Sequence, residues 1–357
     1  MSSEDRDLAL SLLTRRFFDS MGYYTELKVP IFVPIYGDAF QRSSASDVDI
    51  AGIRFDLDFE PSIAIGEAKS PDEKALEEIL KIRSIAEYVR SNKRFLIKSR
   101  IHDNAREIGR HLEVVCLDES ELVETLKRLA VNDGAPSAEE QLSYKQQKSW
   151  FIEMRTQRRT QLLANYLESE VWSRTYWENL HNLLYLLEKF LKSVKMNTAT
   201  FRNFVVFRTA SALSISILYL CRQIMISGLS NLGRGVELYV FGGPAAKRER
   251  ERLRDEVQRA SPTLEGFDIP VEPSFLNDLK EVVAYLMLSP RKAILVPQVF
   301  GEAVEIISTT DGKFDSTKWS KKHDPIAMKL AKDTLEFVCK ACNITEQHQS
   351  LLDFLSL

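Results

Sequence analysis

The sequence predicts an α/β domain with a mixed sheet flanked by helices at the N-terminus, followed by a mainly α-helical domain. Short apolar or alternating runs, separated by helical patterns, fill residues 1–131, and this order is typical of an α/β layer. From 139 to 357, apolar residues recur almost throughout at helical spacing. A polar, turn-rich segment at 132–138 lies between these patterns, so we predict a linker there.

The α/β pattern begins with a helix over Glu4–Met21, because its apolar residues recur at helical spacing and Gly22 is placed to end it. Tyr23–Val33 is typical of a strand, with Pro30 at an edge or a bend. The later elements are expected to be a strand through Asp49 to Phe55, a strand ending at Lys69, a helix from Ser70-Pro71 to about Ser91, a strand at Arg94–Ile97, a helix at Asp103–Leu112, a strand at Val114–Leu117 and a helix at Glu119–Leu129. The first strands are therefore antiparallel, and helical crossovers join the later ones.

In the second domain, two short apolar runs, Val236–Phe241 and Lys292–Val296, could form strands. The run Phe204–Leu229 has the composition of a membrane span, but Arg208 and Arg222 interrupt it, and a bilayer needs about 20 apolar residues. We expect a buried core helix there. Helices are expected at 139–168, 170–193, 198–227, 244–260, 273–288, 297–308 and 324–342.

The overall composition is that of an ordinary soluble protein. The 357 residues carry a formal net charge of -3, so any surface that binds nucleic acid must be local. The start, MSSEDRDLALSLL, lacks a basic region followed by an apolar one, and this argues against a secretory signal. The four cysteines lie in or beside apolar segments and form no disulfide pattern. A cytoplasmic protein with no membrane attachment is expected.

Three polar side chains on two neighbouring strands give the main indication of chemistry. Val48 and Ile50 are apolar, so alternation predicts that Asp49 faces the other side, away from the core. Glu67 and Lys69 end the next apolar strand, and residues two apart on a strand share one face. The two acids and the lysine are therefore expected to lie close together.

These residue types suit phosphodiester hydrolysis, which needs an activated water and a cation that absorbs charge on the phosphorus centre. Asp49, Glu67 and the backbone carbonyl of Ala68 are the hard oxygen ligands that Mg²⁺ prefers. Lys69 is placed to orient the attacking water or to help deprotonate it, because the pKa of a lysine adjusts readily to its surroundings. We therefore predict a Mg²⁺ site, in which Mn²⁺ substitutes.

An aspartate on one strand and Glu-x-Lys at the end of the next resemble the signature of the PD-(D/E)xK nuclease superfamily, which has the restriction-endonuclease-like fold. The resemblance covers residues 1–131, where the expected order of helices and strands also matches. It implies a metal-dependent endonuclease in which Asp49 and Glu67 are metal ligands and Lys69 is the catalytic lysine. Most members of the superfamily cut DNA, so DNA is the implied substrate.

The chain departs from the superfamily pattern at several positions. Val48 stands where the superfamily name has proline, and Asp47-Val48-Asp49 resembles the acid-x-Asp version of other members, so Asp47 is a candidate auxiliary ligand. Many members also offer an acid from the first helix, and Asp7 is the candidate here. Ser70-Pro71 occupies the place of a polar Gln or Glu that some relatives carry after the lysine.

A purely structural interpretation is also open. In it, Asp47, Asp49, Asp56 and Asp58 are loop and edge acids, and Lys69 is a charge that ends a strand and discourages edge pairing. A bare Glu-x-Lys is common in a chain with this charge content. The agreement between the motif, the strand that bears the aspartate and the surrounding elements favours the catalytic interpretation.

A basic stripe is expected on the helix at 139–168. Lys145, Lys148, Arg155 and Arg159 recur there at multiples of three to four residues, so they could follow nucleic-acid phosphates. A solvated helix face explains the same spacing equally well. A second basic cluster, with the same two interpretations, comprises Lys318, Lys321, Lys322, Lys329 and Lys332.

Two further features have structural explanations. The run Lys247–Arg259 mixes arginine with glutamate, which is typical of an exposed helix with salt bridges. Cys339 and Cys342 form a lone C-x-x-C, and buried thiols explain it better than zinc, because a structural zinc site needs four ligands.

The sequence thus predicts a metal-dependent nuclease that hydrolyses DNA, with a helical domain for recognition or assembly. Such a nuclease joined to a helical module suggests an effector of prokaryotic antiviral defence. We expect a homo-oligomer and a partner protein that supplies sensing or ATPase activity, because the chain has no nucleotide-binding motif of its own. Two alternatives stay open: a catalytically silent nuclease fold that binds nucleic acid or serves assembly, and a nuclease that cleaves RNA.

Overall fold

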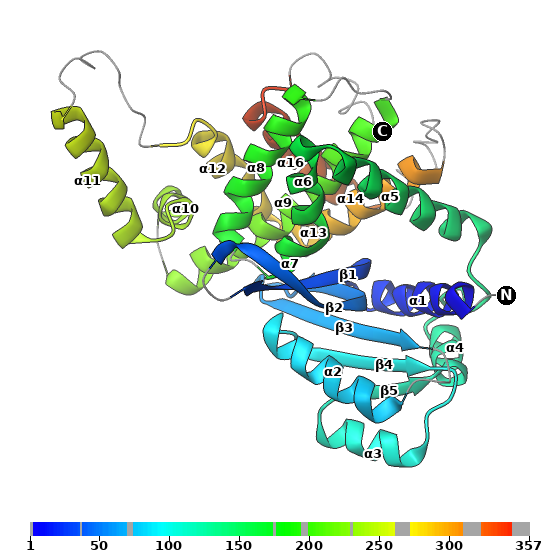
Figure 1. Cartoon of the computed structure of the whole chain (residues 1–357). Coiled ribbons are helices and arrows are strands. Elements are labelled where there is room, and N and C mark those ends of the chain that lie inside the picture. The colour runs from blue at the N-terminus through cyan, green and yellow to red at the C-terminus, as the bar shows by residue number, and fades with distance from the viewer. Residues whose placement is uncertain are drawn as a thin grey trace. The chain divides into compact units, whose positions relative to one another are not determined.

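The chain folds into two compact units, and the computed structural model describes residues 3–35, 38–69, 74–173, 176–193, 199–228, 231–260, 272–309 and 323–344. The first unit comprises Met1–Asp56, Pro61–Arg174 and Gly301–Gly312. The second comprises Leu57–Glu60, Thr175–Phe300 and Lys313–Leu357. The first is an α/β structure and the second is mostly helical (Figure 1).

A five-stranded mixed sheet, in the order β1-β2-β3-β4-β5, forms the centre of the first unit. β1, β2 and β3 are antiparallel neighbours, whereas β3, β4 and β5 run parallel. This is the predicted sequence of antiparallel strands followed by helical crossovers. The strands are β1 (Tyr24–Ile35), β2 (Asp38–Phe55), β3 (Pro61–Lys69), β4 (Lys93–Lys98) and β5 (Val115–Asp118).

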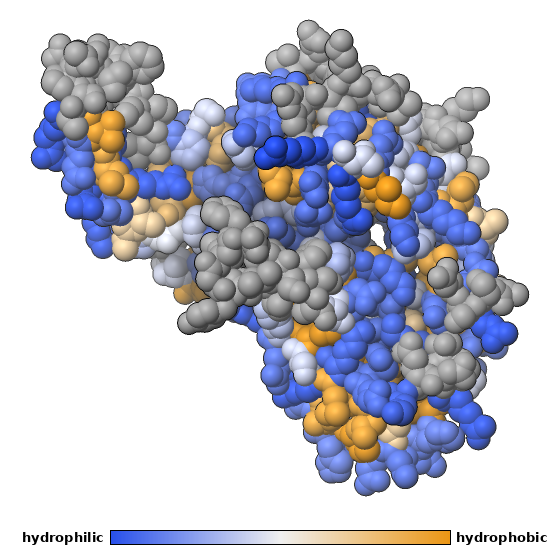
Figure 2. All heavy atoms as spheres, in the orientation of Figure 1, coloured by the Kyte–Doolittle hydropathy of each residue, from blue (hydrophilic) through white to orange (hydrophobic). Residues whose placement is uncertain are grey.

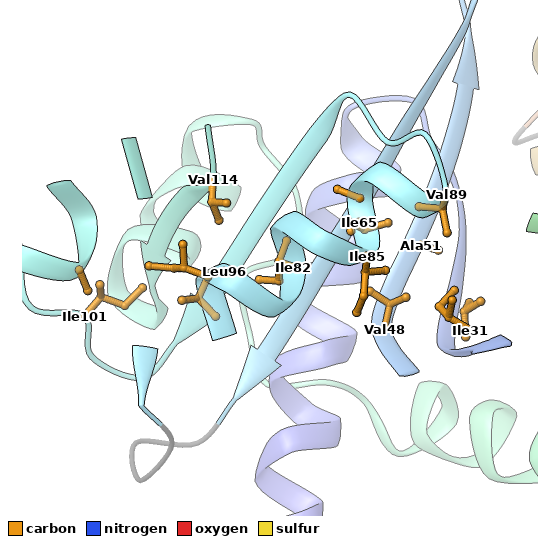
Figure 3. Packing of buried hydrophobic residues seen from close by; sticks show 14 residues of the cluster. Ile31, Val48, Ala51, Ile65, Ile82, Ile85, Val89, Leu96, Ile101 and Val114 are labelled. Carbon is orange, nitrogen blue, oxygen red and sulfur yellow. The ribbon is translucent and has the colours of Figure 1, made fainter. Parts of the chain in front are cut away.

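Helices cover both faces of this sheet. On one face, α1 (Ser3–Ser20) and α4 (Glu119–Arg128) pack through residues such as Phe18 and Leu122. On the other face, α2 (Ala75–Tyr88) and α3 (Asp103–His111) close a second apolar cluster, in which Ile82 and Ile85 of α2 meet strand residues such as Ile65 (Figure 3). The expected helix start at Ser70-Pro71 lies outside the described residues.

The first compact unit continues beyond the linker predicted at 132–138. It includes α5 (Ala138–Thr156), α6 (Arg158–Asn165), the π-helical turn η1 (Tyr166–Glu170) and α7 (Val171–Ser173). The Arg16 guanidinium holds this segment to α1, because it donates to the backbone carbonyls of Asn132 and Gly134 and pairs with Glu140 of α5. η1 packs against β1, and Trp172 of α7 packs on the apolar cluster beneath α2.

Helix α9 (Ala199–Ser227) is the central element of the second unit, and α8 (Tyr176–Ser193) packs beside it. It is the one helix in the described part of the chain with the length and composition of a membrane span, and its most apolar window is entirely buried. The expected core helix is therefore confirmed. The other helices are α10 (Leu232–Val240), α11 (Pro244–Ala260), α12 (Leu276–Leu288), α13 (Pro290–Ala293) and α16 (Pro325–Ala341). Helix α14 (Val296–Thr309) begins in the second unit, and its residues from Gly301 onward belong to the first.

The two short strands suggested for the second domain are wrong. Val236–Phe241 lies almost entirely in α10, where Asn231 caps the N-terminus and the buried Val236 and Val240 stand four residues apart on one helix face. Lys292–Val296 spans the end of α13 and the first residue of α14. Short apolar runs fit a buried helix face as well as a strand, so their periodicity could not separate the two.

Candidate active site

The sheet places Asp49 and Glu67 opposite each other on one face. Ile50 pairs with Gly66 across β2 and β3, so the next step of the antiparallel register sets Asp49 against Glu67. Lys69 follows two residues later on the same face of β3. Like charges directly opposite each other destabilise a sheet, so a fold gains no stability from this pair of acids.

The expectation that Asp49 points away from the core is wrong. Its side chain is 0% exposed and lies on the sheet face that α2 covers, beside the apolar cluster of that face. Strand alternation assigned Asp49 to the correct face of the pleat, but both faces of this sheet are covered by helices. A buried carboxylate needs partners, because desolvation penalises its charge.

Both carboxylate oxygens of Asp49 have such partners. Oδ2 accepts a hydrogen bond from the Ala68 backbone N–H at 2.8 Å and lies 3.3 Å from the Lys69 ammonium. Oδ1 is paired with the ammonium of Lys28 from β1. Burial pushes the pKa of Asp49 upward, but Lys28, a hydrogen bond with Glu67 and the charge of Lys69 outweigh this effect and hold the pKa below its ordinary value.

Glu67 titrates in the opposite direction. Its side chain is also 0% exposed, and this burial, reinforced by the charge of Asp49, raises the pKa of Glu67 to about 8. Lys69 lies 3.3 Å from Oε2 and Lys81 of α2 lies 3.2 Å from Oε1, and both oppose the rise. Asp49 and Glu67 oppose each other in the strand register, and the negative charge of Asp49 is one of the causes that raise the pKa of Glu67.

Two lysines of this cluster were not predicted from the sequence. Lys28 and Lys81 join Lys69, so three ammonium groups surround two carboxylates; we call Asp49, Glu67, Lys28, Lys69 and Lys81 the carboxylate–lysine cluster. Neither lysine gave a signal in the sequence. Lys81 stands beside the buried Ile82 of α2, but a lysine at the border of an apolar helix face can keep its ammonium in water without a partner. Lys98, which pairs with Lys69 in the β3–β4 register, is a further buried lysine near this end of the sheet.

The cluster has donors of the kind that a divalent cation requires. Glu67 Oε1 and Oε2 are buried and accept no hydrogen bond from the described residues, so both oxygens keep lone pairs for a cation. In the described ranges, no group of three or more His, Cys, Asp or Glu side chains gathers. A cation here would therefore be held by Asp49 and Glu67 with backbone and water oxygens, among which the carbonyl of Ala68 remains our prediction.

Helix α5 contributes to the surroundings of the cluster. Burial raises the pKa of the Tyr144 phenol, and the negative charges of Asp49, Glu168 and Asp47 raise it further, so this α5 residue lies in the electrostatic field of the site. Arg155 forms an ion pair with Glu168 of η1, and the charge of Lys148 also acts on Glu168. Tyr144, Lys148 and Arg155 share one face of α5, because four and eleven residues correspond to nearly whole turns.

The structure does not join the two auxiliary acids to the cluster. Asp47 is exposed on β2, and the buried Oδ1 of Asp7 in α1 has no hydrogen-bond partner among the residues that the structure describes. Lys145 is exposed on α5, whereas the side chain of Arg159 lies outside the described residues. Lys318, Lys321 and Lys322 of the second basic cluster also lie outside them.

Two structural explanations from the sequence are confirmed. Arg252 of α11 bridges to Glu249 and Glu256, as expected for an exposed helix with salt bridges. This helix presents a mostly hydrophilic surface with one apolar strip, and Leu253 and Val257 are among its exposed apolar residues (Figure 2). The two thiols of the C-x-x-C in α16 and at its end are buried, and burial raises the pKa of each to about 12.

Comparisons with family models, with curated proteins and with solved structures find no match for this chain. Its activity is therefore inferred from the chemistry of the carboxylate–lysine cluster and from the order of the surrounding helices and strands.

Proposed function

We propose that the protein is a metal-dependent nuclease that hydrolyses phosphodiester bonds of DNA. One observation carries the proposal: Asp49 and Glu67 face each other across two strands while Lys69 lies 3.3 Å from a carboxylate oxygen of each. Two carboxylates can hold the cation that promotes phosphodiester hydrolysis, and a lysine beside them can orient the attacking water. These groups do not stabilise the core by themselves, because the burial of charged side chains carries a desolvation penalty.

Each group of the cluster has a task in this chemistry. A bound Mg²⁺ or Mn²⁺ would supply positive charge to the phosphate and lower the pKa of a water molecule. Asp49 and Glu67 would hold it, and the Ala68 N–H keeps the Asp49 carboxylate oriented through Oδ2. Lys69 contacts both acids and its side chain is 15% exposed, so it joins the buried carboxylates and is still reached in part by solvent.

The arrangement of the elements supports the restriction-endonuclease-like fold that we propose for the first unit. A first helix precedes the sheet, β2 carries Asp49, β3 ends with Glu67 and Lys69, and α2 and β4 follow. This is the order that the resemblance to the PD-(D/E)xK superfamily implies. The choice of DNA as substrate follows from the same resemblance, and an RNA-cleaving enzyme would use the same groups.

The basic face of α5 supports a nucleic-acid substrate. Lys148 and Arg155 lie on the same helix face as Tyr144, whose pKa is influenced by Asp49. Nucleic acids bind mainly through their phosphates, and lysine and arginine side chains beside a hydrolytic site can position the backbone. We propose that this face of α5 contacts the phosphates that flank the cleaved bond.

A second candidate function is favoured by the three lysines. They outnumber the two carboxylates, and Lys28 pairs with Asp49 while Lys81 lies beside Glu67. A cluster in which ammonium groups replace a cation would make the fold a nucleic-acid-binding module without catalysis. Direct titration with Mn²⁺ separates the two functions, because only the nuclease requires the cation.

The nuclease proposal predicts the behaviour of three variants in a cleavage assay. With Mg²⁺ or Mn²⁺, the purified protein should cut plasmid, linear duplex or single-stranded DNA, and an RNA arm tests the alternative substrate. Lys69→Ala and Glu67→Gln should lower the rate by about a hundredfold or more, because each removes a group that acts on the reacting atoms. Lys93→Ala is the matched control, since Lys93 is exposed at the opposite end of β4.

Folding is monitored by circular dichroism in each variant. Equal cleavage by the wild type, Lys69→Ala and Glu67→Gln would rule out this site. Metal-independent nucleic-acid binding without any cleavage would favour the binding module.

A further inference from the structure

Lys28 is held in an unusual backbone conformation. Its φ of 53° lies in the left-handed region, which residues other than glycine rarely adopt. The β1–β2 register is the same immediately before and after it, because Leu27 pairs with Ile50 and Val29 with Val48. The left-handed residue therefore stands within the ladder, at the position opposite Asp49. Such a conformation persists only where the surrounding structure imposes it, and it is frequent at functional sites.

The Lys28 side chain contacts the buried Asp49 and also reaches the solvent. Its ammonium pairs with Oδ1, whereas Oδ2 is shared by the Ala68 N–H and Lys69. Asp49 is 0% exposed, but 31% of the Lys28 side chain is exposed. A cation that binds Oδ1 must therefore displace the Lys28 ammonium, because two positive groups cannot share one oxygen without strong repulsion.

The displaced ammonium would remain next to the site. Lysine has a flexible stem that moves its charge by several ångströms, and the side chain already reaches the solvent. The ammonium loses its negatively charged partner when it leaves Asp49. A phosphate that arrives at the cluster would provide a new one. We propose that Lys28 holds Asp49 Oδ1 in the ion-free protein and binds the substrate phosphate once a divalent cation has replaced it. This inference rests on the proposed nuclease function.

The first test measures Mn²⁺ binding to the full chain by calorimetry, without nucleic acid. Lys28→Met should bind Mn²⁺ about tenfold more tightly than the wild type, because the competing positive charge is gone. Lys28→Gly is a second neutral variant, and glycine adopts the left-handed backbone without strain. Lys28→Arg keeps the charge and should bind Mn²⁺ within about twofold of the wild type. Lys93→Met controls for loss of an exposed lysine elsewhere in the sheet.

The second test measures binding of a labelled DNA duplex with Ca²⁺ in place of Mg²⁺, across a range of salt concentrations. Lys28→Met and Lys28→Gly should bind the duplex several-fold more weakly. The slope of log affinity against log salt should fall by about one relative to the wild type, which is the signature of one lost phosphate contact. Lys93→Met should match the wild type in affinity and in slope.

The outcomes separate this inference from the proposed function. If the wild type binds Mn²⁺ and cleaves DNA, but both neutral Lys28 variants match it in Mn²⁺ affinity and in salt slope, the role of Lys28 is refuted and the nuclease stands. If the wild type neither binds Mn²⁺ nor cleaves, the nuclease function is refuted and the role of Lys28 with it. Tighter Mn²⁺ binding together with a reduced salt slope, in either neutral variant, supports the exchange of partners.

Discussion

At the scale of single residues, the two buried acids have diverging pKa values. Burial raises the pKa of Glu67 to about 8, while the neighbouring ammonium of Lys28 helps to hold that of Asp49 below its ordinary value. At neutral pH the pair therefore keeps one proton and one negative charge. A divalent cation competes with that proton, because metal ligands must be deprotonated, so cation binding should strengthen as the pH rises towards 8.

The pH dependence of stability should report the Glu67 proton. The pKa of Glu67 is about 8 in the folded protein and about 4.5 ordinarily, so the folded state holds a proton that the unfolded state releases between these values. The free energy of unfolding should therefore fall as the pH rises from 5 to 8, by more than about 1 kcal/mol. Glu67→Gln carries no such proton and should flatten this dependence. Urea unfolding in EDTA at several pH values measures it.

Asp49 changes stability in a different pH range, so its contribution does not overlap with that of Glu67 between pH 5 and 8. The pKa of Asp49 is lower in the folded protein than in the unfolded chain, so its carboxylate contributes stability at any pH above the pKa of the unfolded chain. That stability is lost only as the pH falls through the lower pKa of the folded protein, in the acidic range below about 4. Parallel curves for the wild type and Glu67→Gln between pH 5 and 8 would contradict the assignment of the proton to Glu67. Glu107→Gln serves as a control, because Glu107 of α3 is exposed and forms no ion pair with a residue that the structure describes.

The residues of the site differ in how far sequence alone could reveal them. Asp49, Glu67 and Lys69 are predictable, because the two-residue period of a strand and a Glu-x-Lys at a strand end place them on one face. Lys28 is not, since a left-handed residue inside a ladder leaves no trace in the residue pattern. Tyr144 is not predictable either, because its position depends on how α5 packs against the sheet.

At the scale of elements, α5 connects the sheet to the basic face beside the site. Its N-terminus has a capping box: the Ser137 side chain accepts from the Glu140 backbone N–H, and the Glu140 side chain accepts from the Ser137 backbone N–H. Glu140 also pairs with Arg16 of α1. Glu140 thus completes the cap of α5 and also ties the helix to α1 of the α/β layer.

Removing this cap should weaken the protein measurably. Ser137→Ala leaves the Glu140 backbone N–H without its side-chain partner, so the free energy of unfolding should fall by about 1 kcal/mol. Ser149→Ala is the matched control in the same helix, because Ser149 is exposed in its interior, and it should change stability by less than about 0.5 kcal/mol. Chemical denaturation of both variants measures the difference. A Ser137→Ala variant as stable as Ser149→Ala would show that the cap is not needed.

Two long helices after residue 138 were predictable from sequence to within one residue at each end. The helix expected at 198–227 is α9, and that expected at 244–260 is α11. The helix expected at 139–168 is instead divided at Gln157, which has an extended backbone, into α5 and α6, with η1 after them. Periodicity continues through such a break, so the pattern could not reveal it.

At the scale of the whole molecule, the compact units divide the chain after Arg174, whereas the residue pattern divides it at 132–138. The polar turn-rich segment ends the α/β layer, but α5 to α7 still belong to the first unit. Composition indicates where the chain turns on the surface. It does not indicate whether the next helices pack back onto the sheet, because that depends on contacts such as those of Arg16 and Trp172.

Two fragments distinguish these boundaries. Fragment 1–174 keeps α5 to α7, whereas fragment 1–131 loses Glu140, the partner of Arg16, and Trp172, which packs on the apolar cluster under α2. Fragment 1–131 therefore exposes part of that cluster to water and leaves Arg16 unpaired. Fragment 1–174 should unfold at a temperature at least about 5 °C higher, in a sharper transition, since 1 kcal/mol shifts the midpoint of a domain of this size by a few degrees.

Thermal unfolding followed by circular dichroism measures both fragments, with the full chain as the reference. Both lack Gly301–Gly312, so the absence of that segment affects them equally. Equal midpoints would place the boundary at 132–138 and would make the contacts of Arg16 and Trp172 incidental. A stable fragment 1–174 that also binds Mn²⁺ would show that the carboxylate–lysine cluster depends on the first unit alone, because all five of its residues lie within it.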